Sequence, residues 1–201
     1  FLNNPIVRPF IAGDYLIVSE DESYYSHGAG FSADIRATEK LNLNLDARVM
    51  ARENKDASIL DGFRNRMTIN ASYIASETMQ IQFSSIVATE ETKTNIQNNR
   101  DYTLNASINK TFKAPFNLIK DPLSAGLSFG GSFREYAGPN PTIDPDTTRN
   151  DYTIRFSPSL TIPAGETMAI LLSAGFTRVD SNIPNSEYDN ISVTLGISKQ
   201  F

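Results

Sequence analysis

The stretch YDNISVTLGISKQF, from Tyr188 to Phe201, alternates apolar and polar residues almost without a break. One parity is apolar and the other small or polar: Ile191, Val193, Leu195, Ile197 and Phe201 against Ser192, Thr194, Gly196, Ser198 and Gln200. A period of two places successive side chains on opposite faces of a β-strand. The stretch therefore predicts a strand with one apolar face and one face of small polar groups.

Nine further segments repeat this alternation. They lie at about 6–19, 31–37, 41–49, 67–73, 79–87, 102–112, 123–133, 152–162 and 168–178. The first is the least regular, because it contains Pro9 and Gly13. Strands of roughly ten to fourteen residues have the length that a tilted strand needs to cross a bilayer. The sequence thus predicts an all-β fold, a transmembrane antiparallel up-and-down β-barrel of about ten strands, with residues 1–201 as one domain.

The expected connections alternate in length. Short ones fall at 38–40, 76–78 and 163–166, with a medium one at 113–122, and longer polar ones at 20–27, 53–62, 90–100, 137–150 and 180–187. Outer-membrane barrels have short periplasmic turns and long outer loops, whereas a soluble β-sandwich has no reason to sort its loops by end. We therefore expect a location in the bacterial outer membrane.

Composition excludes several other classes. Hydrophobic residues make up 40% of the chain and the mean hydropathy is -0.30, without an apolar run of about 18 residues. This excludes a helical membrane protein. The net charge of -5 and the scattered basic residues argue against nucleic acid as a partner. The absence of cysteine excludes disulfides and thiolate metal sites.

The polar face distinguishes a membrane barrel from a soluble one. A soluble barrel would carry many Lys and Glu outside, but here the polar face consists of Ser, Thr, Asn, Gln and Gly. We expect six apolar-face residues to face lipid: Phe129, Ile154, Phe156, Ile170, Ile191 and Leu195. We expect four polar-face residues to face the lumen: Asn105, Thr153, Ser157 and Ser173.

Charged residues also fall on the polar face. They are Asp34, Arg36, Asp46, Arg48, Arg66, Arg134 and Arg155. Such residues form a selectivity constriction in a channel. In a small barrel they pair with each other and fill the lumen, because about eight strands enclose only enough space for side chains. Since Arg36 and Arg48 each lie two residues beyond an aspartate, we expect local neutralisation and a largely filled lumen.

Catalysis and metal binding have weak signals. His27, the single histidine, is expected in an outer loop, and outer-membrane proteases and phospholipases use a histidine near the rim. No aspartate pair accompanies it in a matching context, so we expect a solvated side chain and no enzyme activity. The acidic clusters Glu20-Asp21-Glu22 and Asp144-Pro145-Asp146 lack the spacing of a calcium loop. We expect no metal and no cofactor.

The last strand resembles the sorting signal of bacterial outer-membrane proteins. Thr194, Gly196 and Phe201 match that signal, while Lys199 stands where an apolar residue is usual. The segment 180–190 and the Arg149-Asn150-Asp151-Tyr152 motif are similar to surface lipoprotein assembly modifiers and to β-barrel porin-type proteins. The resemblance covers about the last fifty residues.

The resemblance implies a C-terminal barrel domain that follows a periplasmic portion. It implies recognition by the barrel-assembly machinery during biogenesis, contact with outer-membrane lipid and lipopolysaccharide, and protein partner chains. We expect a membrane anchor or an export- and assembly-linked domain. A passive small-solute channel is the alternative, and a hydrolase active at the rim is a third. The irregular first strand is expected to pair with the last at closure, which makes this seam the place for partner strands or for opening.

Overall fold

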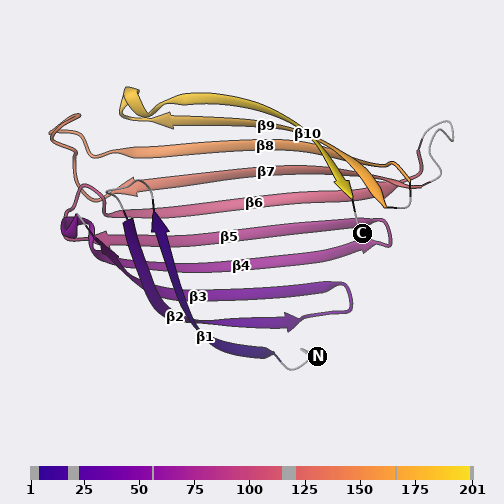
Figure 1. Cartoon of the computed structure of the whole chain (residues 1–201), viewed down its shortest axis with the longest axis horizontal. Coiled ribbons are helices and arrows are strands. Elements are labelled where there is room, and N and C mark those ends of the chain that lie inside the picture. Colours follow the sequence, from indigo (N-terminus) through magenta and orange to yellow (C-terminus); the bar gives the residue numbers. More distant parts are fainter. Residues whose placement is uncertain (1–4, 18–22, 56, 115–120, 166, 200–201) are drawn as a thin grey trace.

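The computed structural model describes residues 5–17, 23–55, 57–114, 121–165 and 167–199 (Figure 1). The ten strands are β1 (Ile6–Ile17), β2 (Ser23–Arg36), β3 (Leu41–Asn54), β4 (Gly62–Ser76), β5 (Met79–Thr92), β6 (Asn99–Phe112), β7 (Leu123–Tyr136), β8 (Asn150–Pro163), β9 (Met168–Ser181) and β10 (Tyr188–Lys199). Two single 3-10 turns, η1 (Ser58–Leu60) and η3 (Pro184–Ser186), lie in connections. Within the described residues no helix is long and apolar enough to cross a membrane.

The strands form one sheet in the order of the sequence, and each neighbouring pair is antiparallel. The predicted all-β fold with ten up-and-down strands is confirmed. Because the strand number is even, β1 begins and β10 ends at the same end of the sheet, the right-hand end in Figure 1.

The connections follow the predicted alternation with one exception. At one end they span 37–40, 77–78 and 164–167, and at the other 55–61, 93–98, 137–149 and 182–187. The connection at 113–122 lies at the first end yet is longer than every connection at the second end except 137–149. The expected loop at 20–27 is also shorter than predicted, because β2 already starts at Ser23 and pairs with β1 through Gly13↔His27.

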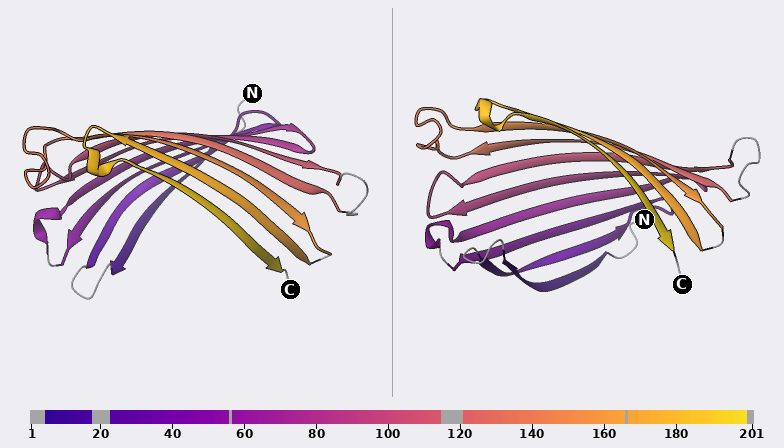
Figure 2. Two further views of the ribbon diagram at one scale, coloured as in Figure 1. Left: turned by 90° about the horizontal axis from the view of Figure 1, so that it is seen from above. Right: turned by 45° about the horizontal axis from the view of Figure 1, so that its top comes forward.

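The sheet is open, whereas the sequence predicts a closed barrel. Figure 2 shows it bent into an arch, with β1 and β10 at its two margins. In the described residues β10 pairs only with β9 and β1 only with β2. The twist and curvature accumulated over ten strands do not bring the margins together. Pro9 and Gly13 lie in β1, where an edge strand tolerates them.

The arch is a single layer and has no second layer to cover it. Its accessible surface is 13801 Å², whereas a folded soluble monomer of this mass exposes about 9,400 Å². Many large apolar side chains are exposed on one face, with Phe129 at 57% and Ile191 at 75%. The few buried apolar side chains, such as Met50, Leu123 and Val179, do not form one contiguous core. A hydrophobic core therefore does not explain why this sheet is stable.

Candidate functional site

The polar face lies on the inside of the arch. Strand register aligns its side chains in rows that cross the sheet, one of which runs from Asp34 through Asn44, Asn70 and Ser84 to Asn105. The Asn44 amide donates to Asp34 Oδ1 at 2.8 Å, and the Asn70 amide donates to Asn44 Oδ1 at 3.2 Å. The first three residues of the row, Asp34, Asn44 and Asn70, therefore form a ladder of side-chain hydrogen bonds that runs across the strands.

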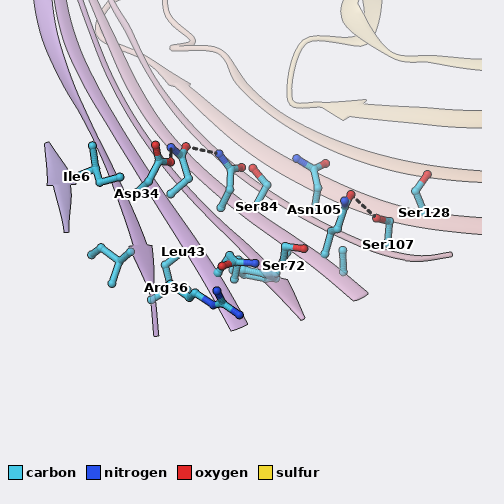
Figure 3. A pocket seen from close by; sticks show the side chains of 17 residues that line it. Ile6, Asp34, Arg36, Leu43, Ser72, Ser84, Asn105, Ser107 and Ser128 are labelled. Carbon is cyan, nitrogen blue, oxygen red and sulfur yellow. Dashed lines mark hydrogen bonds between the residues drawn. The ribbon is translucent and has the colours of Figure 1, made fainter. Parts of the chain in front are cut away.

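This row lines an open cavity of about 900 Å³ (Figure 3). The next row supplies further walls, including Ser72, Ser107 and Ser128, which Figure 3 labels. The Gln80 amide donates to Ser72 Oγ at 2.7 Å. Apart from Asp34 and Arg36, the cavity is lined by uncharged residues. This half of the polar face can hydrogen-bond to a passing chain or solute without attracting one sign of charge.

The other half of the polar face, toward the longer connections, is charged. Asp101 of β6 and Arg134 of β7 are register partners, and Arg134 Nη2 lies 2.7 Å from Asp101 Oδ2. Arg149 donates to Asp151 at 2.8 Å, and Arg52 Nη1 lies 2.9 Å from Glu90 Oε1. Contacts between strands, and for Arg149 a contact with the start of β8, thus pair several of the arginines with carboxylates.

The seven charged residues predicted to face the lumen all lie on this polar face. Asp34 pairs with Arg8 of β1, not with Arg36 as expected. The register explains this, because Ile6 lies opposite Asp34 and places Arg8 diagonally across from it. Arg48 Nε lies 3.9 Å from Asp46 Oδ1, so this expected pair forms at long range. Among the described residues, Arg36, Arg66 and Arg155 form no ion pair.

The six residues predicted to face lipid lie on the opposite, apolar face, in strands β7, β8, β9 and β10. Phe129 and Phe156 are register partners there, as are Ile191 and Phe176. Asn105, Thr153, Ser157 and Ser173 lie on the polar face. Contact with lipid or with a lumen stays a prediction.

An aromatic row crosses the apolar face near the longer connections. The rings of Tyr102 and Phe133 have centroids 6.5 Å apart, and those of Phe133 and Tyr152 are 4.8 Å apart. These contacts depend on the register of β6, β7 and β8. Rows of this kind form the interfacial girdles of membrane barrels.

The remaining predicted residues lie apart from these cavities. His27 lies inside β2 on the apolar face, where it stacks on Tyr25 at a centroid distance of 5.9 Å. Thr194 and Gly196 lie on the polar side of β10, while Phe201 lies outside the described residues. Asp144 accepts the backbone N–H of Asp146 at 3.0 Å, which holds the pKa of its carboxyl below the ordinary range. In the described part of the chain no group of three His, Asp or Glu is placed to hold a metal ion.

These features define a class: a single-layer, up-and-down antiparallel β-sheet with an apolar outer face and a polar inner face. The chain belongs to the surface lipoprotein assembly modifier family, whose sequence profile matches residues 4–201. The match covers nearly the whole chain, well beyond the last strands that carry the resemblance. None of the curated proteins compared with the chain matches it. Family membership indicates a role in surface lipoprotein assembly and a place in the Gram-negative cell envelope.

Proposed function

We propose that the chain is the outer-membrane part of an assembly system for surface lipoproteins, and that it acts without catalysis. Its apolar face contacts lipid, and its polar face lines the route along which a lipoprotein segment is handled. The observation that supports this proposal most directly is the single-layer sheet with one apolar and one polar face, whose accessible surface is 13801 Å². Lipid hydrocarbon is the covering that such an apolar face requires.

The open margins add a requirement to this proposal. Inside a bilayer every backbone N–H and C=O must be hydrogen-bonded within protein, so spanning sheets are closed. The free edges of β1 and β10 must therefore pair in the working form, with each other or with strands outside residues 5–199. A partner chain at this seam fits an assembly role better than a self-contained anchor. Lipopolysaccharide at the outer rim and the barrel-assembly machinery during biogenesis belong to the same proposal.

The chain contains no cysteine, so single-cysteine labelling tests the topology cleanly. We place cysteine at Asp144 in the longest connection and, as the matched control, at Ala164 in a short one. On intact cells an impermeant thiol reagent should label the Asp144→Cys variant and not the Ala164→Cys variant. Labelling at Ala164 alone would invert the topology, and equal labelling of both variants would contradict membrane insertion.

The assembly role needs a separate readout. In cells that lack the protein, externally added protease should digest less of a surface lipoprotein, and the intact chain should restore this digestion. Unchanged lipoprotein exposure in these cells would contradict the assembly role.

A second candidate, a passive small-solute channel, is favoured by the open cavity of about 900 Å³ on the polar face. Planar-bilayer recordings distinguish it from the assembly role. Steady large single-channel currents from the purified protein would favour the channel. The absence of current, or only brief and irregular openings, would favour the assembly domain.

A further inference from the structure

Four arginines converge on a small cavity at the charged half of the polar face. This cavity, of about 120 Å³, is lined by Arg48, Arg52, Arg64, Arg66, Asp14, Tyr24, Ser26 and Met50. Arg48 and Arg66 stand directly opposite each other on β3 and β4. Like charges opposite each other destabilise a sheet, so this cluster requires anions to compensate it.

Two of the four arginines have partners. Arg52 binds Glu90 at 2.9 Å and lies 3.9 Å from the centre of the Tyr24 ring, while Arg48 has Asp46 at 3.9 Å. The one carboxylate in the cavity, Asp14, accepts a hydrogen bond from Ser26 Oγ at 2.8 Å.

The other two arginines form no ion pair. Arg64 stands opposite Glu90 of β5 in the strand register, but Glu90 binds Arg52. Arg64 and Arg66 form no ion pair or hydrogen bond with any described residue, and Arg66 Nε is a buried donor without an acceptor. Arg48 and Arg64 repel the Arg66 charge, and Asp46 and Asp101 attract it only from beyond ion-pair distance. A buried charged donor without an acceptor is costly, so an anion that reaches it would bind.

A second cavity adjoins the first and shares Arg64 and Arg66 with it. It measures about 470 Å³ and extends across the sheet to Arg134, Arg149 and Arg155. Arg134 and Arg149 hold Asp101 and Asp151. Arg155 of β8 has no ion pair with a described residue. Arg64 and Arg66 of β4 and Arg155 of β8 therefore line two adjoining cavities that together reach from β1 to β10, and none of the three forms an ion pair with a described residue.

We propose that Arg64, Arg66 and Arg155 bind the carboxylates of an extended acidic polypeptide segment on the polar face. The guanidinium fork matches a carboxylate with two parallel hydrogen bonds. Several arginines spread over adjoining cavities suit a chain that presents several carboxylates. The hydrogen-bonding Ser and Asn rows beside them suit an extended backbone. A lipid phosphate is less favoured, because acyl chains would contact the other, apolar face. The inference rests on the proposed handling of lipoprotein segments and names the chemistry of the segment.

The test uses the full-length protein refolded in zwitterionic detergent and a fluorescein-labelled peptide of ten glutamates, with fluorescence anisotropy as the readout. A peptide of ten glutamines is the uncharged control. Arg66→Gln should weaken binding of the glutamate peptide about tenfold, since a hydrogen bond to a charged partner is lost. Arg64→Gln, at a more exposed position, is the second variant and should act in the same direction. Arg36→Gln is the matched control, because it removes one charge at the far end of the same face.

Three outcomes would overturn the inference. One is no binding of the glutamate peptide, and another is equal weakening by Arg66→Gln and Arg36→Gln. The third is displacement of the peptide by inorganic phosphate, or by phosphatidylglycerol vesicles, at equal anion concentration. Peptide binding by a protein that fails the cysteine-labelling test would contradict the proposed function alone. Correct labelling without peptide binding would contradict this inference alone.

Discussion

The two faces of the arch are built on the same strands and differ in how much room they leave. On the outer face, a methyl group added at Gly131 would find its nearest neighbour, the Thr153 carbonyl oxygen, at 3.5 Å. On the inner face, a methyl group at the adjacent Gly130 would lie 2.3 Å from Asn105 Oδ1, and one at Gly28 would lie 2.0 Å from the Val49 carbonyl oxygen. Curvature crowds the inside and opens the outside. The small residues of the inner face are therefore a geometric requirement as well as a matter of polarity.

The largest expected effect comes from placing a charge on each face. Phe156→Arg puts an arginine on the apolar face, and we expect it to cost about 2–4 kcal/mol of stability in a bilayer. Ser157→Arg, the next residue along β8, points to the polar face. It meets the crowding of that face but no hydrocarbon, so it should cost less than Phe156→Arg. Urea titration of protein refolded into phosphatidylcholine vesicles measures both. Equal costs would remove the distinction between a lipid-facing and an inward-facing side.

The second prediction concerns the crowding. Gly28→Ala forces the added carbon against the backbone of β3, which cannot move as a side chain does, and should destabilise the protein by about 1–3 kcal/mol. Gly131→Ala meets only ordinary contacts and should change stability by less than about 0.5 kcal/mol. The same vesicle titration applies. If Gly28→Ala were as stable as Gly131→Ala, the inner face would not be the crowded one.

Both faces and all ten strands could be predicted from the sequence, because a period of two is a local property that each segment carries by itself. The pairing of individual residues between neighbouring strands could not be predicted in this way. A two-residue connection at 77–78 restricts the register of β4 and β5, but the ten residues of 113–122 leave the register of β6 and β7 open. For this reason the Asp101–Arg134 pair was missed.

The sequence also could not predict that the sheet stays open at β1 and β10, or how strongly it curves. An edge strand alternates as a central one does, so the pattern of β1 and β10 does not say whether they meet. The partner of Asp34, Arg8, was missed because β1 is the irregular strand and its register with β2 was unknown. The arginines without partners could be placed on the polar face by parity, yet only the register shows that Arg48 and Arg66 face each other.

A smaller effect is expected from the ion pairs of the polar face. Arg134→Gln breaks two contacts of the guanidinium with Asp101 Oδ2, at 2.9 and 2.7 Å, and leaves a largely covered carboxylate behind. We expect a loss of about 1 kcal/mol, because water still screens the arginine side. Arg178→Gln is the comparison variant, since its pair with Asp180 lies on the outer face near the end of β9 and is half exposed at both partners. It should cost less than about 0.3 kcal/mol. A larger loss for Arg178→Gln in urea titration would argue against this ranking.

The smallest effect lies in a connection, where charges belong to neither face. Asp61, at the end of the connection 55–61, accepts the backbone N–H of Asn54 at 2.7 Å and lies 3.0 Å from Lys93 Nζ. The Asn54 N–H first, and then Lys93, hold the pKa of the Asp61 carboxyl below its ordinary value of 3.8. A carboxyl whose pKa is lower in the folded state contributes stability above the unfolded value and loses it as the pH falls through the folded value. The connection should therefore keep its contacts from pH 7 down to pH 5 and lose them only below 3.8.

Amide hydrogen exchange at Asn54, followed against pH and corrected for intrinsic rates, measures this loss. In Asp61→Asn the same amide should show no such transition. A transition centred above 3.8 would mean that the folded protein disfavours the carboxylate, and would contradict the contacts with Asn54 and Lys93.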